Sequence, residues 1–111
     1  MYISNKARDD VYNLGAEAII AADQFLDIQI EAKDALGIIN ILILDNRDKF
    51  EAYRKYSREY LPILTQMSEL SRLLLGERGR LGFASHEEVY EEVLETRNNL
   101  AALINQPIRE N

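Results

Sequence analysis

Acidic side chains recur at helical spacing in two parts of the chain, and this pattern comes nearest to a catalytic one. Two groups stand out: Glu88, Glu91, Glu92 and Glu95, and Asp23, Asp27, Glu31 and Asp34. Carboxylates on facing helices are suitable ligands for Mg²⁺, so one hypothesis is a Mg²⁺-dependent, all-helical nucleotide hydrolase. The simpler interpretation is that each group forms the solvated face of a helix.

The remaining residues argue against an enzyme. His86 is the only histidine, and Val89 and Tyr90 occupy the positions where a helical metal site would need further ligands. There is no cysteine, no phosphate-binding loop ending in Lys-Ser/Thr and no serine nucleophile elbow. We therefore expect no catalytic residue, no metal and no cofactor. The lack of cysteine fits a reducing, cytoplasmic setting.

Basic residues concentrate in the middle of a chain whose net charge is −6. Residues 46–82 carry eight basic and five acidic side chains, a net charge of +3. The possible nucleic-acid or anion contacts are Arg47, Arg54, Lys55, Arg58, Arg78 and Arg80. The alternative is that this basic stretch packs between acidic helices of the same chain.

The elements that carry these residues are helices, because apolar residues recur at heptad spacing. Two rows spaced by seven form what we call the first seam: Val11, Leu14, Ala18, Ala21, Phe25, Ile28, Ala32, Ala35, Ile39 and Leu42. This pattern predicts a long helix over about residues 5–44, starting after the capping residue Ser4. Four alanines in the seam predict close packing with a partner helix.

A second heptad pattern follows a turn at residues 45–48. Its apolar members are Tyr53, Tyr56, Tyr60, Ile63, Met67, Leu70 and Leu74. They predict a helix over about 47–75, with a kink or break at residues 58–62 because of Pro62. A glycine-rich loop is expected at 76–84 and a third helix at about 86–105, opened by a Ser85–Glu88 capping box. Together these elements predict a single domain, 1–111.

The expected helix lengths favour assembly. A helix of about 40 residues is roughly 60 Å long, whereas a compact chain of this size is only about 30 Å across. The predicted fold is therefore all-α, an antiparallel hairpin of two long helices plus a shorter third one, in an oligomeric bundle. The longest apolar run, 36–44, is too short to span a bilayer, so we expect no membrane partner.

One further pattern lies in residues 66–86, in the set Gln66, Glu69, Leu70, Arg72, Leu75, Arg78, Leu81, Ser85 and His86. Through these residues the segment resembles the end of the central helical region in small terminase subunits of tailed bacteriophages. The resemblance implies a non-enzymatic, ring-forming protein that recognises viral DNA in the host cytoplasm and passes it to a separate ATPase–nuclease subunit.

The leading functional prediction is thus a non-catalytic, homo-oligomeric assembly or adaptor protein, with DNA or another protein as a possible further partner. A second hypothesis is a viral or plasmid-encoded inhibitor or decoy that binds a host protein or sequesters a ligand. The Mg²⁺-dependent hydrolase is the third.

Overall fold

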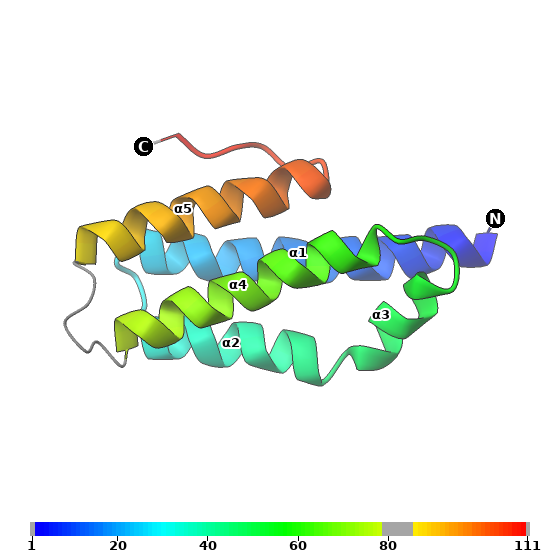
Figure 1. Ribbon diagram of the computed structural model, residues 1–111, viewed down its shortest axis with the longest axis horizontal. Helices are drawn as coiled ribbons and strands as arrows, with labels where there is room; N and C mark the ends of the chain where they lie inside the picture. Colours follow the sequence, from blue (N-terminus) through cyan, green and yellow to red (C-terminus); the bar gives the residue numbers. More distant parts are fainter. Residues whose placement is uncertain (1, 79–85, 111) are drawn as a thin grey trace.

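The computed structural model describes residues 2–78 and 86–110, and within these the side chains of residues 5–76 and 87–110. Five helices account for most of them (Figure 1). They are α1 (Tyr2–Leu26), α2 (Ala32–Leu44), α3 (Arg47–Arg54), α4 (Tyr60–Arg78) and α5 (His86–Leu103). The described residues contain no strand, so the all-α prediction is confirmed. None of these helices is long and apolar enough to cross a membrane.

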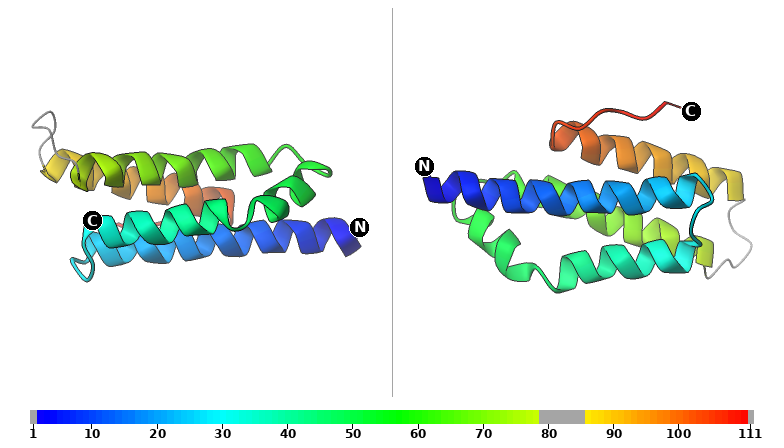
Figure 2. Two further views of the ribbon diagram at one scale, coloured as in Figure 1. Left: turned by 90° about the horizontal axis from the view of Figure 1, so that it is seen from below. Right: turned by 180° about the vertical axis from the view of Figure 1, so that it is seen from behind.

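Four of the helices form an up-and-down bundle, and the short α3 crosses one end of it (Figures 1 and 2). Successive long helices run antiparallel: α1 packs against α2 and α5, and α4 packs against the same two helices from the other side. The molecule measures 47 × 27 × 22 Å. Every long helix therefore shares one central core with the others.

The single helix expected over 5–44 is two helices, which corrects the sequence prediction. Residues 27–31 reverse the chain, with Ile28 in the left-handed region at φ 59° and 87% exposed. The backbone N–H of Glu31 donates to the Asp34 carboxylate at 3.2 Å, which satisfies a free donor at the start of α2. Heptad spacing does not reveal such a turn, because two antiparallel helices that bury faces on one core keep the same spacing as one long helix.

The second predicted helix, 47–75, is also divided. Residues 55–59 separate α3 from α4, where the hydroxyl of Ser57 accepts the backbone N–H of Glu59 at 3.0 Å. Pro62 is the third residue of α4, in the first turn, where a missing N–H costs no helical hydrogen bond. Helix α4 continues through Gly76 to Arg78, so the helix end expected at residue 76 is wrong. The rest of the expected loop, with Arg80 and the predicted capping residue Ser85, falls on residues 79–85, outside the described part.

The first seam lies in the core formed by the chain's own helices. Eight of its ten residues are buried: Val11, Leu14, Ala18, Ala21, Phe25, Ala32, Ala35 and Ile39. Leu42 is half-buried and Ile28 is exposed. Because α1 has 25 residues and α2 only 13, no 60 Å helix remains that needs cover from another molecule. The length argument for an oligomer therefore no longer applies.

The second seam and α5 complete this core. Tyr53, Ile63, Met67, Leu70 and Leu74 are buried, whereas Tyr60 is half-buried and Tyr56 is 52% exposed. Helix α5 adds Val89, Val93 and Leu100, and Ile104 follows directly after its end. The packing of α1 on α5 is close at Gly15, where an added Cβ would lie 3.1 Å from Ile104 Cδ1. A glycine there lets the two helices approach.

Candidate interaction surfaces

One outer side of the bundle, between α2 and α4, is apolar and exposed. We call it the α2–α4 face: Gly37, Asn40, Ile41, Leu44, Leu61, Leu64, Ser68, Ser71 and Leu75. The aliphatic side chains of Ile41, Leu44, Leu61 and Leu75 are each more than half exposed, at 59%, 57%, 54% and 54%. In the part of the chain that the structure describes, no segment covers them.

The register of this face is set by a hydrogen bond between its two helices. The Ser71 hydroxyl donates to the Asn40 side-chain carbonyl at 2.8 Å. Because α2 and α4 are antiparallel, Gly37 and Leu75 both lie about one turn from this bond towards one end of the bundle, at 1.5 Å per residue. Leu44 and Ser68 lie about one turn towards the other end. Gly37 is therefore level with Leu75, and Leu44 with Ser68, whereas Leu61 lies ten residues before Ser71, towards the α3 end.

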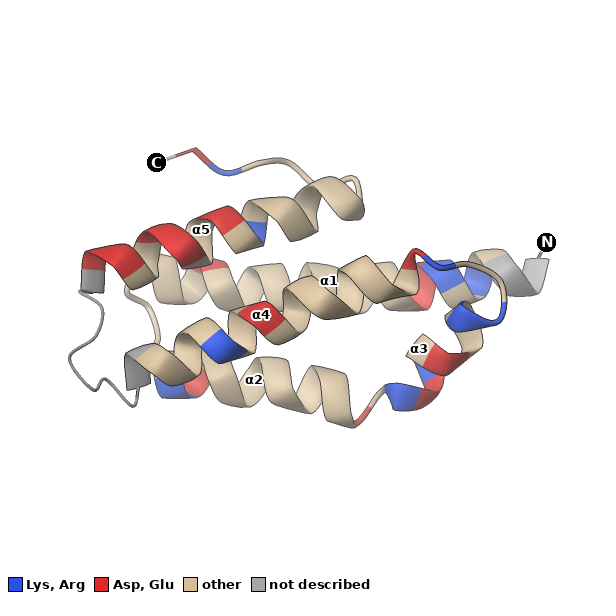
Figure 3. Cartoon of the chain, viewed as in Figure 1, with Lys and Arg blue, Asp and Glu red and all other residues tan. Residues whose placement is uncertain are grey.

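Charge is nearly absent from this side of the molecule (Figure 3). Residues 35–44 contain no charged side chain, and residues 60–76 of α4 contain only Glu69 and Arg72. These two pair with each other, and the hydrogen bond from Arg72 lowers the pKa of the Glu69 carboxyl. The outer face of α5 is instead acidic, with exposed Glu87, Glu88, Glu91, Glu92 and Glu95.

The predicted basic contacts gather at one end of the bundle without forming a strongly positive surface. Arg47, Arg54, Lys55 and Arg58 are all exposed on α3 and the linker to α4. Acidic residues alternate with them: Asp45, Asp48, Glu51 and Glu59. Arg54 itself pairs with Glu51 at 3.2 Å. The side chains of Arg78 and Arg80 lie outside the described residues, and nucleic-acid contact stays a prediction.

The two acidic groups do not meet as a metal site. Asp23 and Asp27 are engaged by arginines from elsewhere in the chain, and Asp34 accepts a hydrogen bond at the start of α2. Within residues 2–78 and 86–110, no three histidine or acidic side chains come together in a way that could hold a metal ion. The side chain of His86 is not among those described.

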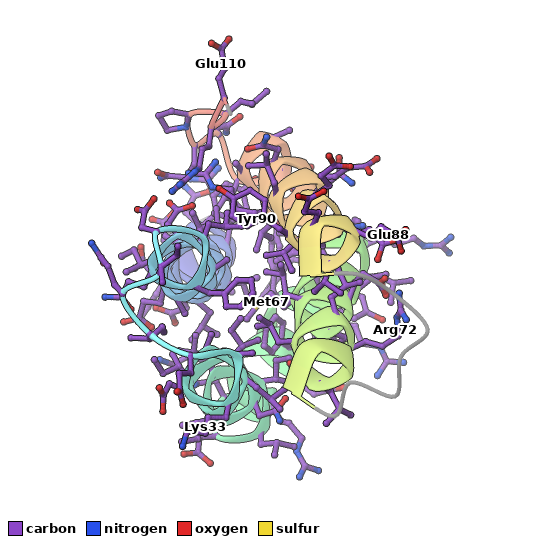
Figure 4. The ribbon with its side chains drawn as sticks, turned by 90° about the vertical axis from the view of Figure 1, so that its left-hand side faces the viewer. Lys33, Met67, Arg72, Glu88, Tyr90 and Glu110 are labelled. Atoms are coloured by element: carbon purple, nitrogen blue, oxygen red, sulfur yellow. The ribbon has the colours of Figure 1, made fainter. Side chains whose placement is uncertain are left out.

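On the opposite side of the bundle, the groove between α1 and α5 is covered by residues 105–110, which we call the C-terminal strap. Helix α5 is terminated by Asn105, in the left-handed region at φ 59°, and the N–H of Gln106 bonds to the Ala101 carbonyl at 2.8 Å. The strap then runs back beside α5 (Figure 1). In the end-on view of Figure 4, Glu110 on the strap and Lys33 on α2 lie on opposite sides of the molecule.

Two neighbouring residues of α5 bind the backbone of the strap. The Asn98 side chain donates to the carbonyl of Arg109 and accepts its N–H, both at 2.8 Å. Arg97 donates from Nη1 to the Pro107 carbonyl at 2.7 Å. The strap is thus held through its main-chain groups.

Arginines also join the strap and α5 to α1. Arg97, only 7% exposed, donates to the two carboxylate oxygens of Asp23 at 2.9 and 3.1 Å. Arg109 donates to Asp27, which lowers the pKa of that carboxyl, and lies 3.4 Å from Asp23. Sequence reasoning missed this site. A signal was present, because Arg97 is four residues after Val93 and three before Leu100, on the buried face of α5.

A tyrosine–carboxylate contact fixes the end of the bundle near α3. The Tyr53 hydroxyl donates to Glu59 at 2.7 Å, and burial, followed by this bond, raises the pKa of Tyr53 to about 12. Burial also raises the pKa of Tyr12, whose ring lies under the Arg8 guanidinium at 5.9 Å. Both phenols therefore stay protonated at neutral pH, and the contact ties the α3–α4 linker to the bundle.

Comparison with protein-family models, with curated proteins and with solved structures found no match. Residues 66–78 of the segment that resembles small terminase subunits lie in α4, and the relationship itself stays a prediction.

Proposed function

We propose that this protein is a non-catalytic assembly protein whose α2–α4 face binds the same face of a second copy. The observation that carries the proposal is the exposure of aliphatic side chains on two adjacent helices with almost no charge between them. Contiguous apolar patches of this kind mark interaction sites on monomer surfaces. The proposal retains the predicted homo-oligomer and places its contact on a surface other than the first seam.

Charge favours a second copy as the occupant. Two chains of net charge −6 that met through α5 would bring its exposed glutamates together, at an electrostatic cost. The α2–α4 face holds no charged residue, and the nearby Glu69–Arg72 pair is neutral. A two-fold dimer uses the same patch on both subunits, so each residue of the patch lies near the same residues of the other copy. An uncharged patch can pack in this way without repulsion between like charges.

Small residues favour close helix packing across such a contact. Gly37 has no atom within 4 Å of the position where a Cβ would lie, and Ser68 and Gly76 are exposed on the neighbouring helix. A standard interface buries about 800 Å² per partner, roughly a tenth of the 6966 Å² that this chain exposes. Two adjacent helices can provide that area.

The test is the mass of the particle in solution, measured by sedimentation equilibrium over a wide range of protein concentration. Wild type should be a dimer that dissociates on dilution, and Ile41→Glu should be a monomer with unchanged helicity. Ile20→Glu is the matched control, because Ile20 is equally exposed (57%) but lies on α1. A wild type that stays monomeric at high concentration would exclude the dimer.

The inhibitor or decoy hypothesis differs only in what occupies the same face. A monomer that used the α2–α4 face for a host protein would lose that partner on Ile41→Glu, without any change in its own mass. The sedimentation experiment separates the two, since it contains no other protein.

A further inference from the structure

The contacts that hold the C-terminal strap are of a kind that recognises extended peptides in general. The Asn98 side chain hydrogen-bonds to both the N–H and the C=O of Arg109. Arg97 donates a hydrogen bond to the carbonyl of Pro107, two residues before Arg109. Such contacts depend on main-chain groups that every non-proline residue offers. The Arg109 side chain adds a specific contact, because it pairs with Asp27 and Asp23.

The strap adds little apolar burial to the fold. Gln106, Pro107 and Glu110 are exposed, and Ile108 is 63% exposed. The segment is held mainly by polar contacts, which exchange readily for contacts with water. Segments with few buried apolar contacts sit at the low end of local stability and open without unfolding the rest of the protein.

The groove beneath the strap is lined by residues of α1 and α5 that also contact one another. Arg97 is buried and bonded to Asp23 through two nitrogens, and this bond crosses from α5 to α1. Asn98 is the next residue of the same helix, and Asp27 follows the end of α1. An open groove would keep its donors and acceptors in place, and rigid positioning lowers the cost of binding.

We propose that the α1–α5 groove is a binding site for an extended, arginine-bearing segment of a partner protein, and that the chain's own strap occupies it in the free protein. Opposite charge selects the partner, because Asp23 and Asp27 line the groove. The proposal does not rest on the dimer, since the groove and the α2–α4 face lie on opposite sides of the bundle (Figure 4). A dimer would present two such grooves.

The first experiment uses the full chain carrying Arg109→Glu and a fluorescent peptide of residues 105–111 as the probe. The substitution places a carboxylate beside Asp23 and Asp27 and should release the strap. Fluorescence anisotropy should then show peptide binding at least about tenfold tighter than to wild type, where the tethered strap competes at high effective concentration. A peptide with alanine in place of its arginine should bind at least about tenfold more weakly.

A pair of neighbouring asparagines supplies the matched control. Asn98→Ala in the Arg109→Glu chain should abolish peptide binding, whereas Asn99→Ala should not, because Asn99 is exposed on the next position of α5. The proposal is overturned if the folded Arg109→Glu chain binds no peptide, or if both asparagine variants bind equally. It is also overturned if the peptide converts a wild-type dimer to monomers, which would assign the groove to the strap of a second copy.

Discussion

The two outer sides of this bundle differ: polar contacts hold a segment of the chain over the α1–α5 groove, whereas the α2–α4 face is apolar and uncovered in the described part of the chain. Between α1 and α5, Gly15 is closed off by Ile104 and the groove is crossed by the strap, with arginine, asparagine and aspartate contacts fixing its register. Between α2 and α4, Gly37 faces open space, and exposed isoleucine and leucine side chains surround the Asn40–Ser71 bond. Polar, directional contacts are suited to a segment that must lie in one register. An uncharged apolar face is suited to packing against the same face of a second copy.

The largest expected effect comes from the buried arginine of the α1–α5 side. Arg97→Ala should lower the free energy of unfolding by about 3 kcal/mol, because it removes both close hydrogen bonds to the partly buried Asp23 carboxylate and leaves only Arg109, 3.4 Å away. Arg72→Ala, which breaks the exposed pair beside the α2–α4 face, should cost less than about 1 kcal/mol. Urea unfolding followed by circular dichroism measures both. Equal losses of unfolding free energy in the two variants would show that the ion pair of the α1–α5 side is no stronger than the exposed pair beside the α2–α4 face.

The tyrosine contact at the α3 end gives a pH test that involves neither groove. The pKa of Tyr53 is raised from 10.0 to about 12, so its contribution to stability is complete below pH 10 and is lost as the pH rises towards 12. A shift of two units corresponds to about 2 to 3 kcal/mol. Tyr53→Phe should flatten this part of the stability–pH curve, and Tyr56→Phe, at an exposed position, should leave it unchanged.

Substitution of one glycine on each side, Gly37 and Gly15, compares the packing of the two sides directly. Gly37→Ala should raise the stability of the dissociated chain by roughly 0.5 to 1 kcal/mol, since alanine favours helix and nothing crowds its Cβ. Gly15→Ala should gain less or lose stability, because its Cβ would lie 3.1 Å from Ile104. Thermal unfolding at high dilution measures both. In the proposed dimer, Gly37→Ala should also weaken association, as sedimentation would show.

The smallest expected effect is on the strap itself. Arg109→Ala removes contacts to Asp27 and Asp23 at the surface, so global stability should hardly change. Carboxypeptidase should nevertheless digest the strap faster in this variant, and high salt should produce the same acceleration in wild type. An unchanged digestion rate would mean that the Asn98 and Arg97 backbone contacts are sufficient to hold the strap.

Much of the local structure followed from the sequence, but the long-range structure did not. Heptad spacing identified the buried faces of α1, α2 and α4, and Pro62 marked an interruption before α4. The turn at 27–31 was missed because Ile28 continues the seven-residue spacing although it is 87% exposed. The α2–α4 face was visible in the sequence only as the apolar run 36–44, which is too short for a membrane span and does not show which of its residues stay exposed.

The sequence by itself determined that the chain is helical and which side of each helix is apolar, since both follow from spacing within one turn or a few. Only the tertiary structure decided what those sides pack against. The first seam could be covered by another molecule or by the chain's own later helices, and periodicity is the same in both cases. Likewise, Arg97 and Asp23 are 74 positions apart, and nothing local in either indicates the other. Folding brings them together, and that contact defines the groove.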